Sequence, residues 1–84
     1  MPYINSETRK KLDPLIDGLA VQLDFAGELN YVITRLCAHR FKRDPNYKWI
    51  AEITGVLENV KQEFYRRLAT PYEDEKLAQN GDVF

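Results

Sequence analysis

The sequence predicts an all-α fold, a small bundle of three main helices with a short fourth helix at the C-terminus. Apolar residues recur every three or four positions almost throughout, and no stretch alternates as a strand would. Proline and glycine stand between the periodic segments, where they interrupt helices. We expect helices over residues 14–24, 28–41 and 46–69, and a short one over residues 71–79, in a single domain spanning residues 1–84.

The first helix follows an apolar series with the spacing of one helical face: Leu12, Leu15, Ile16, Leu19 and Leu23. Asp13 followed by Pro14 fits an N-cap and a first helical residue, so we expect the helix to begin at Pro14, after a turn opened by Ser6. Gly18 weakens this helix by up to about 1 kcal/mol relative to alanine. Packing must therefore hold it.

The second helix follows a break at residues 24–27. Its apolar stripe consists of Leu29, Val32, Ile33, Leu36 and Cys37. Pro45 disfavours a helical conformation at Asp44, so the helix is expected to end before that point.

The third helix is the longest, at roughly 36 Å. Its stripe consists of Ile50, Ile53, Leu57, Val60, Phe64 and Leu68, widened by Trp49 and Val56. Part of this stripe overhangs the shorter helices, and a chain of 84 residues has only a thin core. We therefore expect a homo-oligomer, most simply a two-fold dimer.

Pro71 allows two interpretations: it kinks the third helix, or it opens the fourth helix behind a Thr70 cap. Acidic residues 73–75 suit the first turn of such a helix. Asn80-Gly81 is typical of a helix end.

Composition excludes several classes of protein. The net charge is −1, so no overall charge attracts nucleic acid or anionic lipid, and acids at Glu52, Glu58 and Glu63 on the third helix disfavour phosphate. No apolar run approaches the roughly 20 residues of a membrane span. A single cysteine and the lack of a signal sequence predict a cytoplasmic protein.

Catalytic and metal-binding patterns are missing from the sequence. Cys37 and His39 would point about 200° apart on a helix, so they share neither a metal ion nor a catalytic role. The glycines are too scattered for a phosphate loop. We therefore expect a non-enzymatic protein without cofactors.

Tyrosines and arginines are the candidate ligand-binding or interface residues, because both are favoured binding anchors. Tyr31 and Arg35 are i, i+4 neighbours that can stack; they form either an interface patch or an exposed stabilising pair. Arg40 lies in line with the second stripe. It either snorkels from a frayed helix end or places a cation at the rim of a pocket.

A second set of candidates lies near the C-terminus: Tyr65, Arg66, Arg67 and Tyr72. Guanidinium groups bind carboxylate or phosphate through two parallel hydrogen bonds. One arginine is therefore expected to pair with the acids at residues 73–75, leaving the other to face a partner.

Several polar blocks resemble a family of small proteins of unknown function from bacteriophages and from bacterial and prophage genomes. They are Leu29-Asn-Tyr-Val-Ile-Thr-Arg35, Glu63-Phe-Tyr-Arg-Arg67, Pro71-Tyr-Glu-Asp74 and Asn80-Gly-Asp-Val83. The resemblance covers nearly the whole chain. It implies a phage-type accessory protein, located in the host cytoplasm.

The functional hypothesis combines this context with the tyrosines and arginines. The protein would counteract host defence by sequestering an anionic, nucleotide-type signal at an oligomer interface. Tyr31 and Tyr65 would stack on a base while Arg35, Arg66 and Arg67 meet phosphates. The alternatives are an interaction module that inhibits a host protein and a structural phage component.

Overall fold

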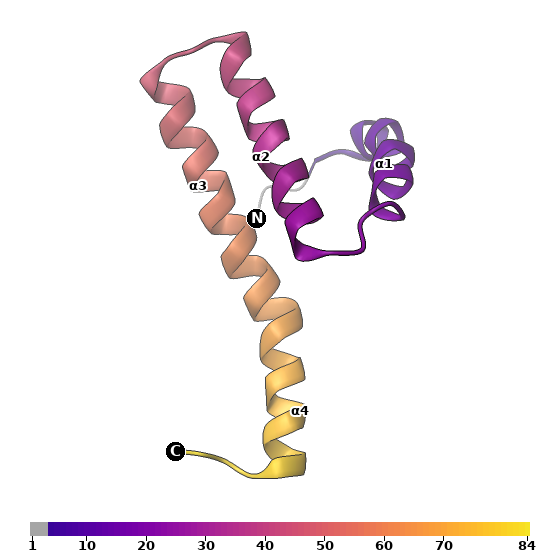
Figure 1. Ribbon diagram of the computed structural model, residues 1–84, viewed down its shortest axis with the longest axis vertical. Helices are drawn as coiled ribbons and strands as arrows, with labels where there is room; N and C mark the ends of the chain where they lie inside the picture. The colour runs from indigo at the N-terminus through magenta and orange to yellow at the C-terminus, as the bar shows by residue number, and fades with distance from the viewer. Residues whose placement is uncertain (1–3) are drawn as a thin grey trace. The chain divides into compact units, whose positions relative to one another are not determined.

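The structure is a computed structural model that describes residues 4–84, and all regular structure in that range is helical (Figure 1). The elements are α1 (Ser6–Ala20), α2 (Ala26–Arg43), α3 (Tyr47–Phe64), a π-helical turn η1 (Tyr65–Ala69) and α4 (Thr70–Asn80). The all-α prediction is confirmed for these residues. The chain divides into two units after Trp49, and each is considered by itself. The sequence predicted a single domain over residues 1–84, and residues 1–3 lie outside the described range. The single domain stays a prediction.

Helix α1 begins eight residues earlier than the sequence predicted. The side chain of Asn5 accepts a hydrogen bond from the Thr8 amide at 2.9 Å, and Glu7 lies in the first turn, where its charge suits the helix dipole. Pro14 therefore lies inside the helix, and Asp13 is not its cap. The prediction was wrong because the helix starts at the upstream cap, Asn5, and continues through Pro14.

Helix α2 is capped from within its own first turn. One carboxylate oxygen of Glu28 accepts hydrogen bonds from the amides of Asp24 and Phe25, each at 2.8 Å. At the other end, Arg40, Lys42 and Arg43 lie in the last turn, where cations suit the negative end of the dipole. The helix thus extends two residues beyond each predicted boundary.

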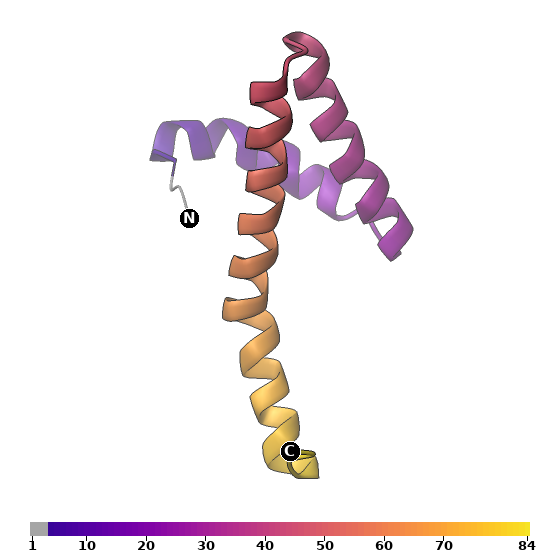
Figure 2. The ribbon, with the colours of Figure 1, turned by 90° about the vertical axis from the view of Figure 1, so that its left-hand side faces the viewer.

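Helices α3 and α4 form one continuous helix through η1 (Figures 1 and 2). Phe64, Ala69 and Thr70 all keep right-handed helical backbone angles, so the predicted boundary at Thr70-Pro71 is not a break, and Thr70 does not act as a cap. At about 1.5 Å per residue, residues 47–80 span roughly 50 Å. The Asn80-Gly81 stop is confirmed: Gly81 has φ +90° and its amide donates to the Leu77 carbonyl at 2.8 Å.

Neither unit encloses a hydrophobic core of its own: no side chain among residues 4–84 is fully buried. The most sheltered apolar side chains, such as Val32, Trp49 and Ile53, are only half-buried. Most of the apolar stripe of the long helix therefore remains exposed. Within residues 4–84 there is also no helix long and apolar enough to cross a membrane.

Candidate functional site

The wide turn η1 is the irregular feature of the long helix, and Pro71 explains its position. In a regular α-helix the proline ring would clash with the carbonyl of Arg67, four residues earlier, and would leave that carbonyl without a donor. The turn opens instead, so that the Thr70 amide donates to the carbonyl of Tyr65, five residues back. Such π-helical turns are rare and occur frequently at functional sites.

The wide turn brings Tyr65 and Glu73 to the same side of the helix. Residues eight apart would lie about 80° apart in a regular α-helix, but one residue accommodated in the wider turn reduces this to about 20°. The Tyr65 hydroxyl accordingly donates a hydrogen bond to the Glu73 carboxylate at 2.8 Å. This hydrogen bond, followed by the negative charge of Glu73, raises the pKa of Tyr65 above its ordinary value of 10.0.

The same change of angle in the wide turn aligns the apolar side chains on either side of it. Phe64 and Tyr72 are also eight residues apart, and Leu68 lies midway between them. Their exposed fractions are 59% for Phe64, 61% for Tyr72 and 61% for Leu68. These three residues continue the line of Ile50, Ile53, Leu57 and Val60, which is itself only partly covered. We call these seven residues the apolar stripe.

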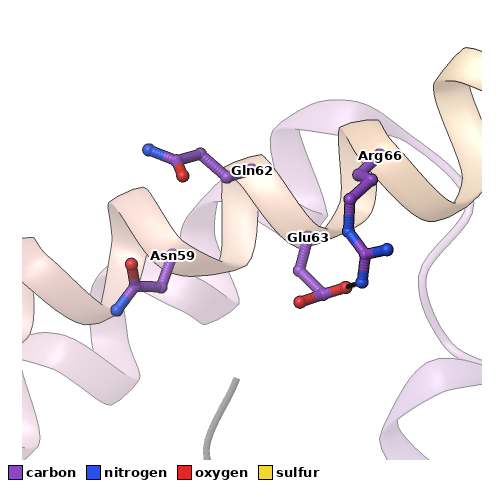
Figure 3. Close-up of a pocket in the computed structure, with 4 residues that line it drawn as sticks. All are labelled: Asn59, Gln62, Glu63 and Arg66. Atoms are coloured by element: carbon purple, nitrogen blue, oxygen red, sulfur yellow. Dashed lines mark hydrogen bonds and ion pairs between the residues drawn. The ribbon is translucent and has the colours of Figure 1, made fainter.

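A shallow depression of about 410 Å³ lies on the polar side of α3 and η1 (Figure 3). It is lined by Asn59, Gln62, Glu63 and Arg66, at spacings of three and four residues along one helix face. Glu63 and Arg66 point toward each other and form an ion pair. Because Glu63 already neutralises this guanidinium, the depression offers little charge to an anion.

Within the described residues, neither Arg66 nor Arg67 pairs with the acids at residues 73–75. The sequence-based expectation that one of them would do so was wrong. The helix does not fold back at Pro71, so Arg66 meets Glu63 one turn below, and Tyr65 rather than an arginine meets Glu73. Arg67 is exposed and has no hydrogen bond or ion pair within residues 4–84. It is therefore available to a partner.

Tyr72 is not tied to a carboxylate in the described chain. The ammonium group of Lys76 lies over its ring, 5.6 Å from the centroid, which is a weak cation–π contact one helical turn away. Most of the ring remains open to solvent. Tyr72 thus presents an aromatic surface on the apolar stripe.

The candidates in the N-terminal unit engage each other. The stacking predicted for Tyr31 and Arg35 is confirmed: the guanidinium donates to the tyrosine hydroxyl at 2.9 Å and lies 5.7 Å from the ring centroid. Arg40 stacks on the ring of Trp49 at 3.3 Å from the centroid. Since α2 continues to Arg43, the idea that Arg40 lies on a frayed end was wrong.

Sequence reasoning missed several partners. Trp49 was assigned to the apolar stripe and Glu63 to the polar side of the third helix. Glu73 was assigned to the first turn of the fourth helix and to a pairing with an arginine. The i, i+3 spacing of Glu63 and Arg66 was a readable signal, but the Tyr65–Glu73 pair depends on the wide turn. Within residues 4–84, no group of three His, Cys, Asp or Glu side chains is placed to hold a metal ion.

Comparison with known proteins places nearly the whole chain in a family but adds no activity. The model of a domain of unknown function (DUF6899) matches residues 1–83, so the chain belongs to that family. No curated protein matches the chain. No solved structure matches it either.

Proposed function

We propose that this member of a family of unknown function acts by binding and not by catalysis, as a helical protein–protein interaction module whose working surface is the apolar stripe. One observation carries the proposal: the longest helix exposes an aromatic and aliphatic line, while no side chain among residues 4–84 is fully buried. Helices owe most of their stability to packing of an amphipathic face. Exposed apolar patches of this kind mark interaction sites.

The nature of the stripe suits a protein partner. Phe64 and Tyr72 supply large rigid contact areas, and Arg67 stands beside them with an unengaged guanidinium. Tyrosine and arginine are over-represented among residues that dominate interface energies. An amphipathic helix with such anchors is a common docking element.

Sequestration of an anionic nucleotide-type signal ranks second. Five of the seven candidate residues are engaged within their own unit. Tyr31 pairs with Arg35, and Arg40 stacks on Trp49. Arg66 pairs with Glu63, and Tyr65 binds Glu73. Only Arg67 favours this role directly, and one exposed cation holds a phosphate weakly. A nucleotide that raises the melting temperature of the parent but not of Arg67→Ala would favour it over the interaction role.

The phage-type context that the sequence blocks imply also enters the proposal. In that setting the module would engage a host protein, its own copies, or both. The interaction surface is the same in each case.

Site-specific photo-crosslinking in the producing cell tests the interaction role. Benzoylphenylalanine replaces Tyr72 on the apolar stripe or, as the control, Gln62 in the polar depression. We expect an adduct of defined mass, to this chain or to another protein, at position 72 and none at position 62. Equal yields at both positions, or no adduct at either, would refute the proposal.

A further inference from the structure

Building on the proposed interaction surface, we infer that the apolar stripe is covered by the same stripe of a second copy, running antiparallel, with the two-fold axis between Asn59 and Val60. The length of the helix supports the choice of partner. α1 and α2 have 15 and 18 residues, or roughly 23 and 27 Å. The stripe from Ile50 to Tyr72 extends over about 33 Å. A helix of matching length is supplied by a second copy.

Charges beside the stripe fix the direction. Glu52 immediately precedes the stripe residue Ile53, and Arg67 immediately precedes Leu68. Both therefore lie on the same side of the stripe; we call each of its two sides a shoulder. A two-fold axis perpendicular to both helices brings each shoulder of one copy against the same shoulder of the other copy. Arg67, which has no partner within residues 4–84, then lies opposite Glu52 of the second copy. Glu52 already has an interaction within its own chain, and a carboxylate accepts more than one donor.

The other shoulder independently gives the same register. Glu58 and Lys61 each immediately follow a stripe residue, Leu57 and Val60. They lie the same distance on either side of the proposed axis, as Glu52 and Arg67 do. Lys61 therefore faces Glu58 of the second copy in the same alignment, beyond its long intrachain contact of 4.0 Å with its own Glu58. This alignment places no like charges opposite each other on either shoulder.

A parallel pair does not satisfy these charges. An axis along the helices brings opposite shoulders together, so Arg67 would face Tyr65 and Ala69 and still lack an acid. Interhelical ion pairs beside an apolar seam set helix orientation in this manner. The antiparallel arrangement is therefore favoured.

Buried area distinguishes the full overlap from a shorter one. A pairing centred near Pro71 would also oppose charges, Arg67 to Glu75, but it would bury only Phe64, Leu68 and Tyr72. At about 200 Å² per large side chain and the exposures given above, that is roughly 700 Å² for both copies, below the about 1,000 Å² expected of a specific interface. The full stripe offers roughly 1,200 Å² or more.

The wide turn has a role in this arrangement. In a regular α-helix Tyr72 would lie about 80° around the axis from Phe64 and would leave the seam. The turn at Tyr65–Ala69 returns Tyr72 to the line, which lengthens the contact beyond Leu68 by about one helical turn.

Charge reversal with sedimentation equilibrium of the purified full chain tests the register. We expect Arg67→Glu and Glu52→Arg each to weaken dimerisation roughly tenfold, because each replaces two symmetric ion pairs with two repulsions. The double exchange Glu52→Arg/Arg67→Glu should recover most of that loss. Arg66→Glu, which makes the same charge change on the opposite face, is the matched control and should change the dissociation constant less than twofold.

Crosslinking gives a second measurement that does not depend on energies. In a Cys37→Ser background, Glu52→Cys and Arg67→Cys chains are mixed and treated with a short bismaleimide. Links between positions 52 and 67 of different chains support the inference. Predominant 67–67 and 52–52 links, or a chain that stays monomeric at all concentrations, overturn it. If the purified chain is monomeric while the probe at position 72 still forms an adduct with another protein, this inference fails and the interaction role stands.

Discussion

The hydroxyl of Tyr65 is the group whose chemistry the wide turn changes most directly. Its hydrogen bond to Glu73 favours the neutral phenol, and the carboxylate charge adds to this, so the pKa lies above 10.0. A pKa raised on folding means that the stabilisation is fully present below the unfolded pKa of about 10. It is lost as the pH rises through the folded value. At neutral pH the bond is intact.

We therefore predict that Glu73→Gln lowers the pKa of Tyr65 toward its ordinary value. The amide carries no charge to oppose the phenolate. The measurement is a spectroscopic titration of tyrosine ionisation, with Tyr65→Phe subtracted to isolate this residue among the five tyrosines. An unchanged Tyr65 titration in Glu73→Gln would show that the bond does not form in solution.

At the scale of elements, the sequence predicted helix identity well and helix ends unevenly. Apolar spacing identified the helices, and Asn80-Gly81 located the last stop, because both signals are local. The start of α1 was misplaced because two caps compete, Asn5 and Asp13, and sequence order does not rank them. In the candidate site, the Tyr31–Arg35 pair followed from i, i+4 spacing. The Tyr65–Glu73 pair did not, since it requires a turn of non-α geometry.

The cap of α1 gives a direct test at this scale. Replacing Asn5 with alanine removes the acceptor for the Thr8 amide and should cost the helix about 1 kcal/mol. The helix is then expected to retreat toward Pro14, with a loss of circular-dichroism signal. Asn59→Ala, in the middle of α3, serves as control and should slightly raise helix content. Equal helix content in Asn5→Ala and the parent would contradict the assigned start.

Substitution of Pro71 tests whether this proline causes the wide turn. Pro71→Ala should permit a regular α-helix and increase intrinsic helix stability by up to about 3 kcal/mol. Glu73 would then rotate away from Tyr65, so the pKa of Tyr65 should fall toward its ordinary value despite the more stable helix. Thermal melting and tyrosine titration measure the two effects. Pro14→Ala is the matched control: it removes another internal proline and should leave the Tyr65 titration unchanged.

For the whole molecule, the exposed stripe links stability to association. If a second copy covers the stripe, folding and dimerisation share one equilibrium, and the melting temperature must rise with protein concentration. A partner helix from the same chain would give a melting temperature that does not depend on concentration. Dilution thus separates the two ways in which the stripe could be covered.

Val60 lies beside the proposed two-fold axis. A substitution there therefore places two altered side chains, one from each copy, close together in the interface. Val60→Glu places two carboxylates in the seam, where burial of unpaired charge is costly and like charges repel. We predict a monomer of low helix content whose melting temperature no longer depends on concentration, measured by sedimentation and circular dichroism. Val83→Glu makes the same chemical change in the exposed C-terminal segment and should behave as the parent does. If Val60→Glu keeps the parent's mass and melting temperature, the stripe is not the surface that holds this protein together.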